Sequence, residues 1–408
     1  MNTYCGIDWA ENHHDIAIVD AQGRKLESDR ISDDLDGLHR LLEMLASHGD
    51  TAGNRIPVAI ETTRGLLVSC LRATGRDVYA VNPMAAARYR DRHTVSRKKS
   101  DAQDAAVLAN ILRTDRHEHR AMPQDSELVQ AIAVLAGAQQ DAVWNRLDQT
   151  NKARSVLREY YPGAVQAFPG STLNSDTART VLRAAPTPAK AAELTTTRVK
   201  GLLRKAGRTR GLETEARRLH EILTSRTMRR LPSVEEAYGQ QLTAMLAHLD
   251  AACTALTNLT RATGELFATH PDAAIITSMP GLAETAGARV LAEIGDDPTR
   301  FNSAASLKAY AGAAPVTRAS GKSHTVLARR VKNNRLAAAG YVWAFSALSS
   351  SPGARAHYDR RKEHGDLHTA AQRNLFNRLL GCLHHCLQNR VRYDESVAFP
   401  HNAQAPGI

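Results

Sequence analysis

The sequence predicts an α/β domain at the N-terminus, followed by a helical central region and a second compact, mainly helical region. Three observations predict this order. Short apolar segments alternate with helical patterns near the N-terminus, a heptad repeat runs through the centre, and a glycine turn between two helical patterns opens the last region. We expect domains at 1–120, 121–270 and 271–399, and a disordered tail at 400–408 that is rich in Pro, Ala and polar residues.

The N-terminal region contains five apolar segments of strand length. Three of them follow one another directly, with the turn Asp20–Gly23 between the second and the third, which predicts a meander. Helical and strand patterns alternate after the meander. The strands are expected at 4–8, 14–20, 25–28, 56–61 and 77–82, and the helices at 34–46 and 66–74. Three strands in a row and then alternating helices and strands is the order of a ribonuclease-H-like sheet.

The central region, 125–270, is almost wholly helical in pattern, and its last part carries a heptad seam. The members of the seam alternate three and four residues apart: Leu242, Met245, Leu249, Ala252, Leu256, Leu259, Thr263 and Leu266. A coiled coil between subunits and a helical hairpin within one subunit both produce such a seam. We favour the coiled coil, and therefore self-association.

The segment Pro280–Gly295 resembles a helix-hairpin-helix element. In such an element a glycine turn presents backbone N–H groups to a DNA phosphate without reading the base sequence. An ordinary pair of packed helices is the alternative.

The charge balance predicts a polyanionic partner. Lys and Arg total 53 against 42 Asp and Glu, which gives a net charge of +11 and a pI near 9.6. Cationic side chains neutralise phosphates and release counterions, so nucleic acid is the expected partner. Basic residues are concentrated in the segments 88–99, 198–230 and 318–335.

The cysteines and the hydropathy pattern indicate a cytoplasmic protein. The five cysteines are odd in number and form no CxxC pair, which favours a reducing compartment. The spacing of Cys382 and Cys386 fits the buried face of a helix better than a zinc site. We find no secretory signal pattern at the first residues and no apolar run long enough to span a membrane.

Four carboxylates form the strongest candidate site. Asp8 ends the first strand, Glu61 ends a later strand, and Asp101 and Asp104 lie three apart at the start of a helix that Ser100 and Gln103 cap. Acids that converge in this way repel one another unless cations lie between them. Oxygen ligands of this kind suit Mg²⁺, so we expect Mg²⁺ as the cofactor.

Other interpretations of these acids are weaker. Asp101 suits a helix N-terminus for electrostatic reasons alone, and Asp104 could be an exposed surface residue. The strand start Gly6-Ile-Asp8 also occurs in actin-like ATPases, but no glycine-rich phosphate loop follows it here. We therefore set ATP binding aside.

A serine near the C-terminal end is the second candidate for catalysis. Gly312, Pro315 and Gly321 predict a tight loop around Ser320, and a hydroxyl in a cationic field could attack a phosphodiester. Ser323 is a rival nucleophile, and a serine that only contacts phosphate is the alternative role. The cations expected to contact nucleic acid are Arg97, Lys98, Lys99, Arg318, Lys322, Arg329, Arg330, Lys332 and Arg335.

Several of these motifs together resemble the bacterial insertion-sequence transposases of the IS110 type. The N-terminal motifs of the resemblance are Gly6-Ile-Asp8, Ile60-Glu-Thr-Thr-Arg-Gly65, Val81-Asn-Pro83 and Lys99-Ser-Asp-Ala-Gln-Asp104. The C-terminal ones are Pro280-Gly-Leu282, Phe301 through Gly312, Pro315 and Ser320-Gly321. The likeness covers both ends of the chain in the right order, and nothing is carried over to the middle, roughly 163–230.

The resemblance implies a RuvC-like domain whose DEDD set corresponds to Asp8, Glu61, Asp101 and Asp104. It also implies a nucleophilic serine that corresponds to Ser320 by its Ser-Gly step, which ranks Ser320 above Ser323. Donor and target DNA, a non-coding bridge RNA and further copies of the chain, from dimer to tetramer, are the partners that it implies. The place of action would be the cytoplasm of a bacterium, at the nucleoid.

The predicted function is that of a DNA transposase or site-specific recombinase that cuts and rejoins DNA through a Mg²⁺-assisted phosphoserine intermediate. One alternative is a metal-dependent, structure-specific nuclease that uses the acids and water without serine chemistry. The other is a nucleic-acid-binding scaffold without catalysis. Neither alternative explains both the complete acid set and the Ser-Gly step.

Overall fold

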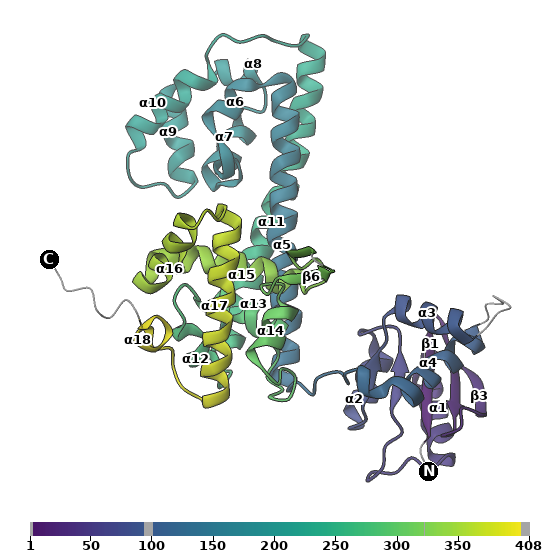
Figure 1. The fold of residues 1–408 in the computed structure, drawn as a ribbon. Coiled ribbons are helices and arrows are strands. Elements are labelled where there is room, and N and C mark those ends of the chain that lie inside the picture. The colour runs from purple at the N-terminus through teal and green to yellow at the C-terminus, as the bar shows by residue number, and fades with distance from the viewer. Residues whose placement is uncertain (1–2, 94–100, 322, 401–408) are drawn as a thin grey trace. The chain divides into compact units, whose positions relative to one another are not determined.

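The computed structural model describes residues 3–93, 101–321 and 323–400. The chain divides into two compact units, Met1–Gln124 and Asp125–Ile408 (Figure 1). The expected fold class is confirmed, because the first unit is a mixed α/β sheet structure and the second is mostly helical. Within the described ranges, no helix is long and apolar enough to cross a membrane.

The first unit is built on one five-stranded sheet with the strand order β3-β2-β1-β4-β5. The first three strands form the expected antiparallel meander, and β4 and β5 run parallel to β1. The strands are β1 (Tyr4–Trp9), β2 (His13–Val19), β3 (Lys25–Ser32), β4 (Val58–Ile60) and β5 (Val78–Ala80). This mixed order is that of a ribonuclease-H-like sheet.

Helices cover both faces of this sheet. Leu41 of α1 and Leu71 of α2 pack in one core with Ile7, while Leu108 of α4 packs in another core with Ala59 on the opposite face. The helices are α1 (Leu35–Ser47), α2 (Leu66–Ala73), α3 (Pro83–His93) and α4 (Asp101–Asp115), followed by the short 3-10 helix η1 (Arg116–Glu118). The basic residues Arg97, Lys98 and Lys99 and the expected cap Ser100 lie outside the described residues.

Gly6 lets α4 lie directly on the sheet. A Cβ atom at Gly6 would come within 2.0 Å of the Ala105 carbonyl oxygen and 2.5 Å of the Ala109 nitrogen. Both are backbone atoms of α4, so the helix could accept a side chain here only by moving away from β1. The glycine thus fixes the height of α4 above the sheet.

We expect Gly6→Ala to lower the free energy of unfolding by about 2–3 kcal/mol, at the upper end of the usual cost of overpacking. The helix must shift as a body because the contact is with its backbone. Chemical denaturation measures the effect, and Gly53→Ala, whose Cβ would meet nothing within 4 Å, is the matched control. Equal stability of the two variants would contradict this role of Gly6.

Two long helices, α5 (Glu127–Tyr160) and α11 (Pro232–Ala268), run through the second unit (Figure 1). They are antiparallel, because Gln139 bonds to Thr260 at one level of the pair while Glu159 bonds to Arg230 at another. Separate hydrophobic cores lie at the two ends of this pair.

The heptad seam of α11 packs within the chain. Leu242, Leu249 and Leu256 are buried in a single copy, mainly where α11 lies along α5. This is the helical hairpin within one subunit, the alternative that the sequence left open, and the expected self-association stays a prediction. A heptad repeat specifies the spacing of an apolar stripe and carries no information on which chain supplies the partner.

A helical lobe connects the far ends of α5 and α11. We define the lobe as residues 162–231, and it has its own core around Leu182, Leu203 and Leu219. Its elements are α6 (Pro162–Ala167), η2 (Gly170–Asn174), α7 (Asp176–Ala184), α8 (Pro188–Ala192), α9 (Thr196–Lys205) and α10 (Leu212–Leu223).

The other end of the helix pair carries the C-terminal helices. They surround a core that contains Phe267, Trp343 and Leu379. The elements are α12 (Ala273–Ser278), α13 (Glu284–Ile294), α14 (Ala304–Tyr310), β6 (Val316–Ser320), β7 (Ser323–Leu327), α15 (Asn334–Ser350), α16 (Pro352–Glu363), α17 (His368–Asn389) and α18 (Glu395–Ala398).

The glycine turn of the expected helix-hairpin-helix element joins α12 to α13. Gly281 has a φ of +78°, and a Cβ there would lie 2.5 Å from the Ala347 nitrogen of α15. The Trp343 indole N–H donates to the Pro280 carbonyl oxygen at 2.9 Å. These contacts give the turn a packing role against α15, which is the alternative interpretation of this segment.

Candidate metal centre and serine hairpin

Strand register places two of the candidate acids on the face of the sheet that α4 covers. Side chains two residues apart on a strand point to the same face, so Asp8 shares the face of Gly6. Gly6 of β1 lies opposite Ala59 of β4, and Glu61 is the next position of that face, directly after β4. Both acids therefore point toward α4.

The first turn of α4 supplies the other two acids. Asp104 is only 5% exposed, and its Oδ1 lies 2.6 Å from Nη2 of Arg90 on α3. It is therefore not the exposed surface residue that the sequence left as an alternative. Asp101 is the first residue of α4 and remains exposed.

Asp8 lies within electrostatic range of the other three acids. The pKa of Asp8 is raised from 3.8 to about 6, and burial of the carboxyl group is the largest cause. The negative charges of Asp104, Glu61, Asp101 and Asp15 contribute the rest of the increase. A carboxylate feels its neighbours in this way only when they lie close by. Asp8 therefore lies near Glu61, Asp101 and Asp104, and we call these four residues the acid cluster. Among the described residues, however, the group whose ligand atoms all lie within 4.8 Å of one another is a different one and shares only Asp101 with this set.

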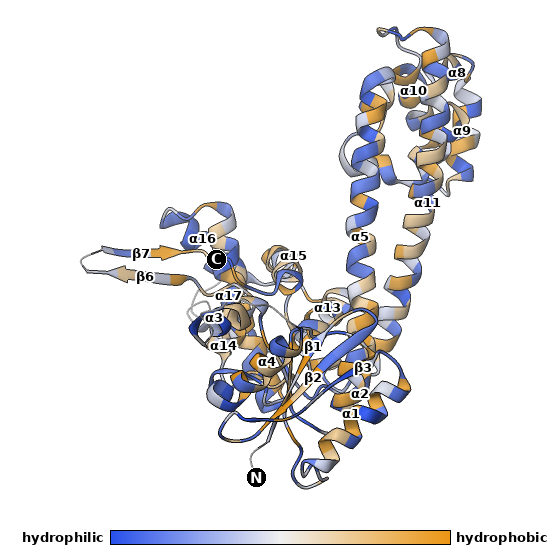
Figure 2. Cartoon of the chain, turned by 90° about the vertical axis from the view of Figure 1, so that its right-hand side faces the viewer, coloured by the Kyte–Doolittle hydropathy of each residue, from blue (hydrophilic) through white to orange (hydrophobic). Residues whose placement is uncertain are grey.

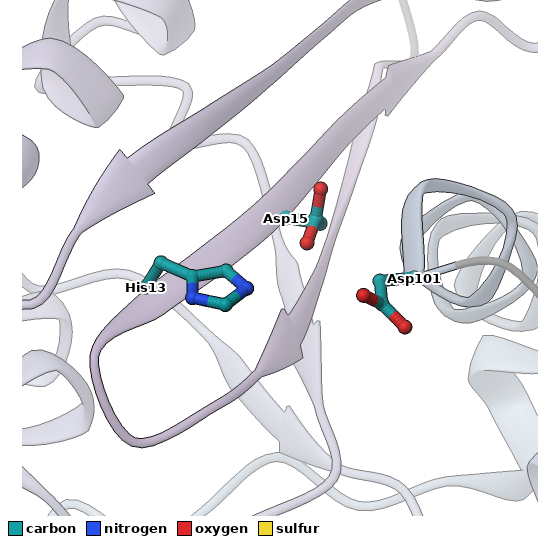
Figure 3. Close-up of side chains that lie close together, drawn as sticks. All are labelled: His13, Asp15 and Asp101. Atoms are coloured by element: carbon teal, nitrogen blue, oxygen red, sulfur yellow. The ribbon is translucent and has the colours of Figure 1, made fainter.

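His13 and Asp15 of β2 form this closer group with Asp101, although the sequence did not single them out. Asp15 lies opposite Asp8 in the strand register. His13, Asp15 and Asp101 each offer a ligand atom within 4.8 Å of the others (Figure 3). The signal was present in the sequence, because a meander pairs β1 with β2 and places every second residue of both strands on one face.

Arg30 of β3 partly balances the charge of this edge. Its Nη2 lies 2.9 Å from Oδ2 of Asp15 and 3.5 Å from Oδ2 of Asp101. The chemistry of the donors fits a divalent cation, since carboxylate oxygens are the ligands that hard ions such as Mg²⁺ prefer. The imidazole of His13 adds one nitrogen donor, which Mn²⁺ and other transition ions accept more readily.

The segment around Ser320, where the sequence predicted a tight loop, forms a β-hairpin. Antiparallel pairing of β6 with β7 places Ser320 opposite Ser323. Gly321 follows with a φ of +54°, as the first central position of a two-residue hairpin turn requires. The hairpin extends away from the helices of its unit (Figure 2), and both serines are exposed. The geometry gives neither serine an advantage over the other.

The register shows which residues share the face of the serines. Arg318 lies opposite Thr325 and two positions from Ser320, so it is on the same face as both serines. His324 lies opposite Ala319 and belongs to the other face. Arg318 is therefore the described cation of the hairpin that is best placed beside the hydroxyls.

The other cations that the sequence predicted to contact nucleic acid differ in whether they already make contacts within the chain. Arg335 pairs with Asp141 at 2.8 Å and stacks on Trp144, so it fastens α15 to α5. Arg329 donates from Nε to the Ala314 carbonyl oxygen at 3.3 Å. Arg330 and Lys332 are exposed after β7, and Lys322 lies outside the described residues.

Comparisons with known proteins agree on one class. A family model of DEDD transposases of the IS110 type matches residues 5–162, and a model described as the transposase IS116/IS110/IS902 family matches residues 273–359. A mini-circle putative transposase for IS117 from Streptomyces coelicolor is 58% identical over 407 residues, which is 99% of this chain and 98% of that protein.

More distant relatives extend over the same length. The uncharacterized 42 kDa protein of the insertion element IS900 from Mycobacterium paratuberculosis is 28% identical over 403 residues, 96% of both chains. The uncharacterized 44.8 kDa protein of IS116 from Streptomyces clavuligerus is 29% identical over 391 residues, 95% of both chains. Residues 163–272 lie between the two segments that the family models match.

Proposed function

The chain belongs to the IS110 family of insertion-sequence transposases, and from this premise we propose that it cuts and rejoins DNA through a phosphoserine intermediate. The observation that carries the proposal is the placement of Asp8 and Glu61 on the α4 face of the sheet, with Asp101 and Asp104 in the first turn of α4. An exposed Ser-Gly hairpin elsewhere in the chain supports the serine step.

We propose that the four acids hold divalent cations, with Mg²⁺ as the natural ion. When bound, such ions stabilise negative charge on the attacking and leaving oxygens of a phosphoryl transfer. Asp8 and Glu61 orient the site from the sheet, and Asp101 and Asp104 close it from α4. Asp15 and His13 adjoin Asp101 and would hold its carboxylate in place or share an ion with it.

In the proposed reaction the Oγ of Ser320 attacks the scissile phosphorus. A phosphoester bond to Oγ forms, the bond from phosphorus to the 3′ oxygen breaks, and the hydroxyl proton ends on that oxygen. The products are a phosphoserine and a free 3′-hydroxyl. The reverse reaction with another 3′-hydroxyl reseals the DNA without an external energy source, because the number of phosphoester bonds is unchanged. Arg318 stabilises charge on the phosphoryl oxygens.

Family membership also supports the proposed partners. These are donor and target DNA, a non-coding bridge RNA that pairs with both, and further copies of the chain in an assembly between a dimer and a tetramer. Packing of Leu242, Leu249 and Leu256 within one chain favours surfaces other than the heptad seam for this assembly.

A covalent adduct tests the proposal directly. Purified protein, Mg²⁺, element-end DNA and the transcribed flanking RNA should yield a protein–DNA species that survives denaturation, and mass spectrometry should find the nucleotide on Ser320. Metal-dependent cleavage without any adduct would favour the nuclease alternative. Binding without cleavage would favour a scaffold.

We expect Asp8→Asn to stabilise the metal-free protein at neutral pH. The pKa of Asp8 is raised from 3.8 to about 6, so the folded protein binds this proton more tightly than the unfolded chain does. Ionisation therefore destabilises the fold as pH rises from about 4 through about 6, and the amide avoids this cost. The melting temperature in chelator at pH 7.5 should rise by roughly 2–4 °C, the effect of about 1 kcal/mol after allowance for solvent screening.

The same experiment separates the acid cluster from ordinary surface charge. Added Mg²⁺ should stabilise the natural protein at pH 7.5 and leave Asp8→Asn unchanged. Asp77→Asn is the matched control, because Asp77 is a half-exposed acid of the same unit that pairs with Arg116 at 2.8 Å. If Asp8→Asn were less stable than the natural protein at pH 7.5, the ionised Asp8 carboxylate would not destabilise the metal-free fold.

A further inference from the structure

The positive charge of the chain is concentrated in the lobe, residues 162–231. These residues contain 14 Lys and Arg against five Asp and Glu, so they hold a net charge of +9 out of the +11 of the whole chain. The remainder of the chain, including the acid cluster and the serine hairpin, is close to neutral in total. The excess that predicts a polyanionic partner is therefore a property of the lobe.

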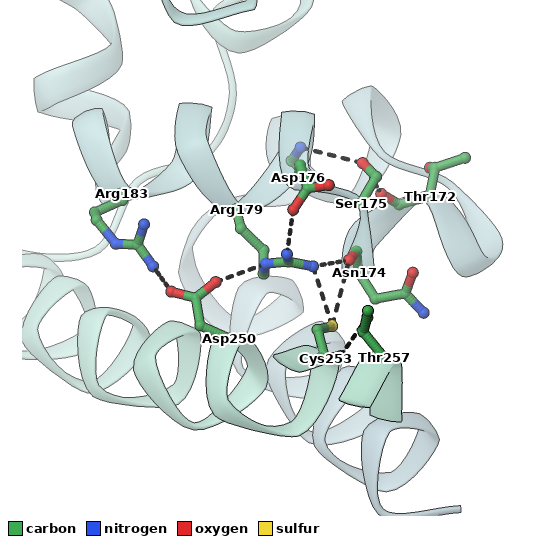
Figure 4. A network of polar contacts seen from close by, with 10 residues as sticks. Thr172, Asn174, Ser175, Asp176, Arg179, Arg183, Asp250, Cys253 and Thr257 are labelled. Carbon is green, nitrogen blue, oxygen red and sulfur yellow. Dashed lines mark hydrogen bonds and ion pairs between the residues drawn. The ribbon is translucent and has the colours of Figure 1, made fainter. Parts of the chain in front are cut away.

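Some of the lobe's cations have structural roles. Arg179 is largely buried and contacts Asp176, Asp250 and the Cys253 thiol, and Arg183 contacts the other oxygen of Asp250 (Figure 4). This network ties α7 to α11. These arginines hold the lobe in place through their contacts with acids.

Other cations near the ends of the long helices are also engaged. Arg229 pairs with the buried Glu235 at 2.7 Å, and Arg230 pairs with Glu159 at 3.0 Å. Lys190 pairs with Glu193 at 3.1 Å. The other cations of the lobe lie in α9, α10 and the turn between them, apart from Arg226, which follows α10.

The α9–α10 segment, 196–223, is the exposed basic surface of the lobe. It contains eight Lys and Arg against three Asp and Glu. Two of these acids are already balanced, because Glu213 pairs with Lys200 and Glu215 pairs with Arg218. Five of the cations are exposed and form no salt bridge with another described residue: Arg198, Arg204, Lys205, Arg210 and Arg217.

The turn between the two helices is built to keep its cations outside the core. Gly207 and Gly211 have φ angles of +81° and +60°, conformations that favour glycine. They flank Arg208, Thr209 and Arg210, all of which are exposed. Val199 and Leu203 of α9 point into the lobe core instead. The apolar residues therefore fix the two helices, and the basic residues face solvent.

We propose that the α9–α10 segment is a binding surface for the phosphodiester backbone of nucleic acid, held without reading the base sequence. Surface cations with no acidic partner gain most from phosphate contact, since binding releases the counterions of the nucleic acid. The segment lies outside both parts of the chain that the family models match, so this surface is additional to the catalytic regions. The inference rests on the proposed function only in taking nucleic acid as the partner.

Equilibrium binding of the full-length protein in chelator tests the surface without any cleavage. The probes are a DNA duplex of unrelated sequence and a single-stranded RNA of equal length. The test variant carries Arg198→Gln, Arg204→Gln, Lys205→Gln and Arg210→Gln. We expect at least a ~10-fold loss of affinity near 0.1 M salt, and a salt dependence whose slope falls by about 0.7–0.9 for each phosphate that the variant no longer neutralises.

Two further variants make the outcome decisive. Arg355→Gln, Arg360→Gln, Lys362→Gln and Arg373→Gln remove the same charge from exposed positions of α16 and α17 and should bind almost as tightly as the natural protein. Arg198→Lys, Arg204→Lys, Lys205→Arg and Arg210→Lys keep the charge and should retain binding. A loss on the duplex alone assigns the surface to DNA, and a loss on the RNA assigns it to RNA.

Unchanged affinity of the α9–α10 variant for both probes would overturn the inference. So would an equal loss in the α16–α17 variant, because the effect would then be one of total charge. Neither result bears on the serine chemistry, and a protein that lacks strand-transfer activity could still bind through this surface. The two proposals therefore fail independently.

Discussion

Ser320→Ala is expected to abolish the joining of DNA strands while DNA binding remains within about twofold of that of the natural protein. Removing the hydroxyl removes the only atom that can form the proposed covalent link, so the loss should exceed roughly 10³-fold, as for other enzymes that lose their nucleophile. Ser320 is exposed and contributes nothing to a core, so the hairpin should fold normally.

Ser323→Ala is the matched control for this substitution. The two serines lie opposite one another beside the same turn, and both are exposed. Strand transfer should persist in Ser323→Ala, and denaturing gels should show the covalent adduct in this variant but not in Ser320→Ala. An adduct that is lost in Ser323→Ala and kept in Ser320→Ala would reverse the assignment. Loss in both variants would indicate that the hairpin face acts as a unit.

Asp104→Asn is expected to lower metal-dependent cleavage by about 10²–10⁴-fold. The amide keeps the shape of the side chain but loses the charge, and several kcal/mol of charge stabilisation depend on a correctly held cation. Asp104 is the most deeply buried of the four acids and is fixed by Arg90 at 2.6 Å. Its position is therefore the least adjustable of the set.

Three measurements distinguish a metal role from a fold role for Asp104. Thermal unfolding reports the cost of weakening the pair with Arg90, calorimetric titration with Mn²⁺ reports ion binding, and single-turnover cleavage reports chemistry. We expect the affinity for Mn²⁺ and the cleavage rate to fall far more than the thermal stability. Cleavage at the natural rate with no bound Mn²⁺ would rule out the acid cluster as the metal centre. Asp77→Asn again serves as the control.

The strands of the α/β sheet and the acids at their ends could be predicted because the residue pattern that marks a strand lies within a few residues of sequence. A charge directly after an apolar strand, as at Glu61, indicates the strand end without knowledge of the rest of the fold. Asp15 was missed because it lies inside β2, where its charge looks like an ordinary alternation of polar and apolar residues. Only the pairing of β2 with β1 makes it a neighbour of Asp8.

The long-range features were harder to predict. The stripe through Leu249 was correct as a helix pattern, but its partner α5 is about 100 residues away in sequence, and periodicity does not identify a partner. The hairpin at Ser320 was interpreted as a loop because its strands are short and polar and bury almost nothing. Its strand character comes from backbone pairing and from the positive φ of Gly321.

The antiparallel pair of α5 and α11 fixes the distance between the core of the lobe and the C-terminal core. Ile132 of α5 belongs to the C-terminal core and Ala153 belongs to the core of the lobe. About 20 residues of uninterrupted helix separate them, a span of roughly 30 Å. Duplex DNA rises about 3.4 Å per base pair, so this distance corresponds to roughly one turn of the double helix. Any protection that the lobe gives to bound DNA should therefore appear as a footprint displaced by about one helical repeat from that of the C-terminal body.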